Sequence, residues 1–176
     1  MTKKNAKSVL MVLAHHNFRD EEYKAAREKF ESIGAQIIVA STVKSGASGN
    51  QGTRLDPDLL IDEVDPNQYD AVVFIGGTGA SQYWHDVKAH EIAKVAARNG
   101  RVVGASSHAP VTLAFAGLLK GKKVTGHASI FEKLAVHGAK YTGKKLEQEG
   151  NIITCSGPNA AKEFAEALAN SLNQVK

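Results

Sequence analysis

The sequence predicts a single three-layer α/β domain over residues 1–176, with a mainly parallel sheet between two layers of helices. Short apolar runs rich in β-branched residues alternate with longer amphipathic runs, a pattern typical of strand–helix–strand units. Parallel sheets of this kind are covered on both faces, and their crossover connections are right-handed almost without exception. The chain shows no internal repeat, low-complexity segment or linker that would divide it.

The elements follow from these runs. The expected strands span residues 9–14, 36–40, 71–75, 101–105, 124–127 and 152–155. The expected helices span residues 21–32, 87–98, 110–119, 130–137 and 160–172. Tyr23, Ala26 and Phe30 share one face of the first helix at helical spacing, and Gly34 marks its end. The polar, glycine-rich residues 44–56 predict an excursion from the core with a small hairpin.

The bulk composition is that of an ordinary globular protein. Its 176 residues suffice for a hydrophobic core, and 43% are hydrophobic and 23% charged. Residues 1–4 resemble the charged opening of a signal peptide, but the apolar run at residues 9–14 is short for its hydrophobic region and far too short to cross a bilayer. Cys155 is the single cysteine, which excludes an internal disulfide framework and fits a reducing compartment. We therefore expect a cytoplasmic protein with no membrane contact.

The net charge of +4 is modest. The lysines form two groups, Lys120, Lys122 and Lys123, then Lys140, Lys144 and Lys145, without interleaved aromatic residues or a nucleic-acid motif. This arrangement favours a solvated basic face, and no nucleic-acid partner is expected.

Residues 102–113 form the most informative segment of the chain. An apolar run stops at Ser106, Ser107 and His108, and a helix-like segment follows at once. This is the pattern of a strand–elbow–helix turn, which holds a nucleophile above the end of a sheet and needs small residues two positions before and after it. Ala105 and Ala109 meet this requirement for Ser107, whereas Ser106 meets it poorly. The alternative is that Ser107 only caps the following helix.

Ligands of open α/β sheets bind beyond the carboxyl ends of the strands. The segments expected there, residues 15–18, 76–79, 106–108 and 127–129, concentrate His, Ser and Gly, as a small-molecule site requires. Residues 76–79 lack both the Walker lysine and the GxGxxG spacing of nucleotide sites, so no cofactor is expected. No pair among His15, His16, His108 and His127 has zinc-ligand spacing, so no metal is expected.

Several segments together resemble the ThiJ/PfpI superfamily, the flavodoxin-like group related to class I glutamine amidotransferases. The resemblance rests on residues 18–22, 70–77, 104–110, 116–125 and 150–158, which follow in order along nearly the whole chain. Ile75 stands where proline is usual, and Arg19 replaces an acidic residue common in the first motif. The resemblance implies a flavodoxin-like sheet and, because family members commonly self-associate, a homodimer.

The resemblance also implies roles for particular residues. The nucleophile of the family is a cysteine, and it aligns with Ser107, whose hydroxyl needs a positioned base because it stays protonated. The glutamate that hydrogen-bonds the nucleophile aligns with Glu22, and burial there should raise the pKa of its carboxyl. The alternative for Glu22 is favourable interaction with the dipole of its helix.

Two histidines and a backbone cradle complete the expected site. His108 resembles the histidine of the protease-like branch and His127 that of the deglycase-like branch, although each also fits a hydrogen-bonded rim histidine. The backbone at Gly76, Gly77 and His108 is expected to bind an oxyanion or substrate. Cys155 aligns away from the elbow and is expected to be a small core residue.

The resemblance implies glyoxalase-, deglycase-, amidase- or peptidase-type chemistry on small carbonyl or amide substrates. A second hypothesis is a noncatalytic stress-response or ligand-binding protein that keeps the fold without the thiol.

Overall fold

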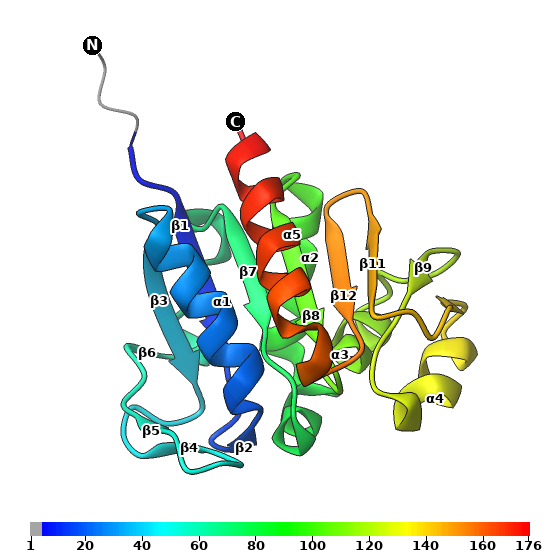
Figure 1. Cartoon of the computed structure of the whole chain (residues 1–176), viewed down its shortest axis with the longest axis horizontal. Coiled ribbons are helices and arrows are strands. Elements are labelled where there is room, and N and C mark those ends of the chain that lie inside the picture. Colours follow the sequence, from blue (N-terminus) through cyan, green and yellow to red (C-terminus); the bar gives the residue numbers. More distant parts are fainter. Residues whose placement is uncertain (1–4) are drawn as a thin grey trace.

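The computed structural model describes residues 5–176, in which a seven-stranded sheet lies between two layers of helices (Figure 1). The charged opening at residues 1–4 lies outside the described residues. The strand order is β11-β12-β8-β7-β1-β3-β6, and every neighbouring pair is parallel except β11 with β12. The predicted three-layer α/β fold with a mainly parallel, flavodoxin-like sheet is confirmed.

The elements have the following bounds. The strands of the main sheet are β1 (Ser8–Val12), β3 (Gln36–Ser41), β6 (Leu59–Leu60), β7 (Ala71–Phe74), β8 (Val102–Ser106), β11 (Leu146–Glu149) and β12 (Ile152–Cys155). The α-helices are α1 (Asp20–Ser32), α2 (Val87–Arg98), α3 (Pro110–Phe115), α4 (Phe131–Val136) and α5 (Ala161–Gln174). Two small sheets join β2 (His16–Phe18), β4 (Ala47–Gly49) and β5 (Arg54–Leu55), and β9 (Lys123–Val124) with β10 (Lys140–Tyr141). The short 3-10 helices are η1 (Ile61–Glu63), η2 (Pro66–Gln68), η3 (Thr78–Tyr83), η4 (Ala128–Ile130) and η5 (Pro158–Ala160).

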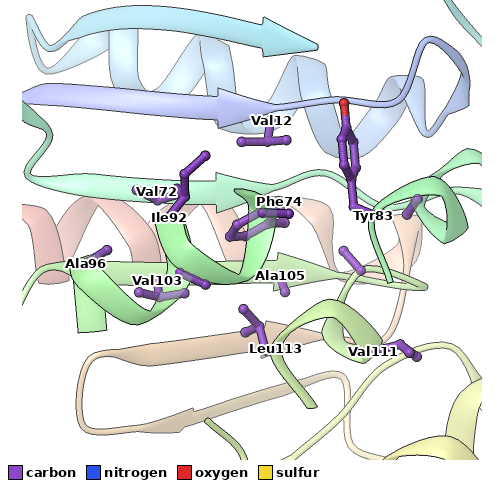
Figure 2. Packing of buried hydrophobic residues seen from close by; sticks show 14 of the residues in the cluster. Val12, Val72, Phe74, Tyr83, Ile92, Ala96, Val103, Ala105, Val111 and Leu113 are labelled. Carbon is purple, nitrogen blue, oxygen red and sulfur yellow. The ribbon is translucent and has the colours of Figure 1, made fainter. Parts of the chain in front are cut away.

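Hydrophobic cores lie on both faces of the sheet. Helices α1 and α5 cover one face side by side, where Phe30 and Phe164 are fully buried (Figure 1). Helices α2 and α3 cover the other, where Ile92 and Leu113 belong to one buried cluster with the strand residues Val72 and Val103 (Figure 2). Burying such side chains is worth about 1.5–3 kcal/mol each, so the two cores fix the strands that carry the site.

Helix α2 and strand β12 have the boundaries that the sequence predicts. The Asp86 carboxylate accepts a hydrogen bond from the Ala89 N–H at 2.7 Å, which caps the start of α2. The excursion after β3 contains the predicted small hairpin, in which β4 pairs antiparallel with β5.

Most of the other predicted elements are shifted by one or two residues at an end, and two differ by more. The helix expected to reach residue 119 ends at Phe115, since Gly117 has a φ of +79°, which terminates a helix. The strand expected at residues 124–127 is reduced to the end of β9 and lies outside the main sheet, because the chain turns toward the elbow, where the His127 N–H binds the Ser107 carbonyl.

Strand β11 was not expected, because its sequence LEQE is polar and carries no apolar run. No helix within residues 5–176 has the length and apolar character to cross a membrane.

Candidate active site

Ser107 occupies a tight turn directly after β8. Its φ is +44°, a left-handed conformation that is uncommon for residues other than glycine. The turn is held from both sides, because the Ser107 N–H donates to the Cys155 carbonyl at 3.0 Å and the Ser107 carbonyl accepts from the His127 N–H at 2.8 Å. The sequence therefore placed the elbow at the right residue.

The hydroxyl of Ser107 does not cap the following helix. Helix α3 begins after Ala109 and has no side-chain cap. The Ser107 hydroxyl instead accepts a hydrogen bond from the Gly77 N–H at 2.9 Å. This bond joins the ends of β7 and β8 and fixes the direction of the hydroxyl.

Ser106 repeats this arrangement one residue earlier. Its hydroxyl accepts from the Gly76 N–H at 2.9 Å, so two consecutive serines are anchored to two consecutive glycine amides. Because each serine oxygen is the acceptor in its bond, each hydroxyl proton remains free to donate elsewhere. Sequence reasoning rejected Ser106 as nucleophile and missed this second hydroxyl, although two serines ending a buried strand are themselves a signal.

The acceptor that faces both hydroxyls is Glu22, in the first turn of α1. Its side chain is fully buried, and neither carboxyl oxygen makes a hydrogen bond of standard geometry with another group in residues 5–176. Burial raises the pKa of Glu22 from 4.5 to about 7, against the opposing influence of the Ser107 and Ser106 hydroxyls and of Arg19. A carboxyl with a pKa near 7 can either hold or release its proton at neutral pH, and such shifted values are common in functional sites.

The start of α1, and with it Glu22, is fixed by the neighbouring Asp20. The buried Asp20 carboxylate accepts hydrogen bonds from the Gln51 and Thr53 N–H groups at 2.8 and 2.9 Å. Burial alone would raise the pKa of Asp20, but the hydrogen bonds from Thr53 and Gln51 outweigh it and hold the pKa below its ordinary value. The Asp20 carboxylate thus ties the loop between β4 and β5 to the first turn of α1.

The two candidate histidines lie against each other rather than being hydrogen-bonded to Ser107. The rings of His108 and His127 are stacked with their centroids 4.4 Å apart, and both bind Ser129. His108 is half-buried and His127 is exposed. Burial, and then the nearby His127 and Arg19, lower the pKa of His108, which keeps its imidazole neutral.

The expected oxyanion site at Gly76, Gly77 and His108 is partly occupied by the protein itself. The Gly76 and Gly77 N–H groups bind the two serine hydroxyls. The His108 N–H makes no hydrogen bond within the part of the chain that the structure describes. Of the three expected donors, it is the one available to a substrate oxygen.

Cys155 is a free, fully buried cysteine at the end of β12. Burial strongly raises the pKa of its thiol, which is therefore protonated and unreactive at neutral pH. This environment supports the predicted core role. Within residues 5–176, no three His, Cys, Asp or Glu side chains are grouped so as to hold a metal ion.

The parallel sheet, the elbow at Ser107 and the buried Glu22 define a class: flavodoxin-like α/β proteins with a strand–elbow–helix turn. Residues 7–171 match the sequence profile of the DJ-1/PfpI family, and the chain belongs to that family.

Known proteins agree with this assignment. The structure of a ThiJ/PfpI domain protein from Brachyspira murdochii superposes with a TM-score of 0.93 at 33% identity, covering 97% of this chain and 99% of that one. The putative cysteine protease YraA of Bacillus subtilis is 32% identical, over 93% of this chain and 97% of its own length. The deglycase PfpI of Pyrococcus furiosus is 29% identical, over 90% of this chain and 98% of its own length.

Proposed function

We propose that this protein is an enzyme acting on small carbonyl or amide substrates, with Ser107 as nucleophile and Glu22 as the group that takes its proton. The observation that carries the proposal is the Ser107 hydroxyl, held on a strained elbow by the Gly77 N–H and facing a buried carboxyl with a pKa of about 7. The similarity to a deglycase and a putative cysteine protease supports this substrate range.

The proposed first step is addition to the substrate carbonyl. The Ser107 oxygen forms a bond to the carbonyl carbon, its proton moves to the Glu22 carboxylate, and the electron pair of the C=O bond moves to the substrate oxygen. The backbone N–H of His108, which has no hydrogen-bond partner within residues 5–176, stabilises the resulting oxyanion. For an amide, collapse of this adduct expels the amine, which takes from Glu22 the proton that came from Ser107. Water then hydrolyses the serine ester and restores the Ser107 hydroxyl.

Turnover of methylglyoxal and of simple amides by wild type and Ser107→Ala tests the proposal. Loss of the nucleophile should lower kcat by at least about 100-fold on the productive substrate. Ser171→Ala, which removes a remote hydroxyl on α5, is the matched control and should retain wild-type turnover. Equal turnover by the Ser107→Ala variant and wild type would remove Ser107 from the mechanism.

The second candidate is a noncatalytic ligand-binding or stress-response protein. It is favoured by the burial of the Ser107 side chain, which is 2% exposed, and by the absence of the thiol that the family resemblance places there. In this case no carbonyl or amide is turned over, but a ligand of the pocket raises the unfolding temperature.

The Ser107→Cys variant tests whether the pocket is built for nucleophile chemistry. We expect a thiol at position 107 that peroxide oxidises and that disulfide reagents titrate, while buried Cys155 stays unmodified as an internal control. The measurement is mass spectrometry of the oxidised protein. A variant in which neither thiol reacts would show that the pocket does not support such chemistry.

A further inference from the structure

The Ser129 hydroxyl is within hydrogen-bond distance of one ring nitrogen of each of the two stacked imidazoles. Its hydroxyl oxygen is 2.7 Å from Nδ1 of His127 and 3.3 Å from Nε2 of His108. The Ser129 N–H also donates to His127 Nδ1, at 3.2 Å. Ser129 is the middle residue of the short η4 helix, two residues after His127.

The directions of these hydrogen bonds follow from the Ser129 backbone N–H, because it can act only as a donor. A backbone N–H always donates, so His127 Nδ1 carries no proton and its neutral ring is protonated on Nε2. The Ser129 hydroxyl, only 2.7 Å from the same bare nitrogen, must then donate to it as well. With its proton committed to His127, the Ser129 oxygen accepts from His108, which places the His108 proton on Nε2.

The other ring nitrogen of His108 is consequently a bare acceptor. His108 Nδ1 is buried and has no hydrogen-bond partner within residues 5–176. Buried polar atoms are nearly always paired, so an unpaired acceptor immediately after the elbow residue indicates a group kept free for a proton.

We propose that Ser129 is a positioning residue that holds His108 in the tautomer protonated on Nε2. Glu22 takes the proton of Ser107, and the bare Nδ1 of His108 accepts the proton of the water that hydrolyses the serine ester. The proposal deepens the proposed function and rests on it for the consequence in turnover. It also assigns unequal roles to the two histidines: His127 anchors Ser129, and His108 takes part in the chemistry.

The charged groups around His108 and His127 are consistent with different roles for the two histidines. Two imidazoles stacked 4.4 Å apart disfavour simultaneous protonation, and the nearby Arg19 adds to the effect on His108. Burial acts in the same direction, so the pKa of His108 is lowered and the ring is neutral. A neutral imidazole with one bare nitrogen can accept a proton.

The test is nitrogen-15 NMR of protein labelled in its histidine rings, because ring shifts distinguish protonated from bare nitrogens. In wild type at neutral pH we expect His108 to show one tautomer, with bare Nδ1 and protonated Nε2. Ser129→Ala should introduce the other tautomer, seen as movement of the two His108 shifts toward each other. Ser129→Thr, which keeps the hydroxyl, should restore the wild-type spectrum, and Ser171→Ala should not change it.

Kinetics supply the second readout. If the enzyme proposal holds, Ser129→Ala should lower kcat about 10- to 100-fold with little change in KM, and Ser129→Thr should recover most of the loss. A proton on His108 Nδ1 in wild type, or identical spectra for wild type and Ser129→Ala, would overturn the role of Ser129. The expected spectra without any turnover by wild type would retain the tautomer assignment and overturn the proposed function instead.

Discussion

Glu22→Gln should make the protein more stable than wild type at alkaline pH and about equally stable at acidic pH. The pKa of Glu22 is raised from 4.5 to about 7 by burial, so the folded state holds this proton more tightly than the unfolded state. Such a group contributes stability that is fully present below the unfolded pKa and is lost as pH rises through the folded pKa. Glutamine cannot ionise, so the Glu22→Gln variant does not lose this stability as the pH rises.

The size of the effect follows from the shift. One pKa unit corresponds to about 1.4 kcal/mol, so wild type should lose roughly 3 kcal/mol relative to Glu22→Gln once the pH is well above 7. For a chain of this length that is about 6–12 °C in the unfolding temperature. The measurement is thermal unfolding of both proteins from about pH 5 to about pH 9.

Glu28→Gln is the matched control, because Glu28 is an exposed glutamate on the same helix. It should leave the pH dependence of wild type unchanged. If the stability difference between Glu22→Gln and wild type does not grow with pH, the Glu22 carboxyl does not titrate near neutrality. It would then be unable to exchange a proton with Ser107 in the way proposed above.

Gly76→Ala should be among the most damaging single substitutions in the chain. A Cβ atom at this position would lie 1.9 Å from the Ser107 hydroxyl oxygen, 2.3 Å from the Ser106 carbonyl oxygen and 2.8 Å from Glu22 Oε1. The Ser106 carbonyl belongs to the backbone of a central strand and cannot move without distorting β8. We expect a loss of about 3 kcal/mol in the free energy of unfolding, together with loss of turnover.

Gly117→Ala separates this steric effect from glycine's conformational freedom. Gly117 has a φ of +79° and open space around it, so alanine there is strained but meets no neighbour. The expected cost is about 1–2 kcal/mol, with turnover retained. Chemical denaturation and turnover of both variants make the comparison. A Gly76→Ala variant that is as stable and active as Gly117→Ala would show that the backbone does not approach Ser107 so closely.

The elements that the sequence predicts best are those with a local signal. Helix α2 has a capping aspartate and an apolar stripe, and β12 is a short apolar run, so both were predicted at their true boundaries. Strand β11 has neither signal, since its pairing with β12 comes from tertiary contact. Residues 124–127 look like a strand locally, but their backbone is bonded to other segments, as in the Thr125 N–H bond to the Thr154 hydroxyl.

The candidate site also contains features with a local sequence signal and features that depend on tertiary contacts. The turn at Ser107 is predicted from the small residues that a tight turn requires, and Glu22 is proposed for the site from the resemblance to a known motif. The bond from Gly77 to Ser107 and the bridge from Ser129 to the two histidines join strands and loops distant in the chain. No spacing rule within one segment reports such contacts, because they depend on how β7, β8 and the segment after β9 meet in space.

The turn at Ser107 is held by a hydrogen bond from its N–H to the carbonyl of Cys155, a residue that is synthesised later. The turn can therefore form only after that part of the chain has been made. Strand β12, which provides that carbonyl, leaves the ribosome after every other strand of the sheet. A nascent chain therefore lacks the support that bends the backbone at Ser107 until β12 has been synthesised. The geometry of the elbow is therefore completed only after the strands on both sides of β8 have been made.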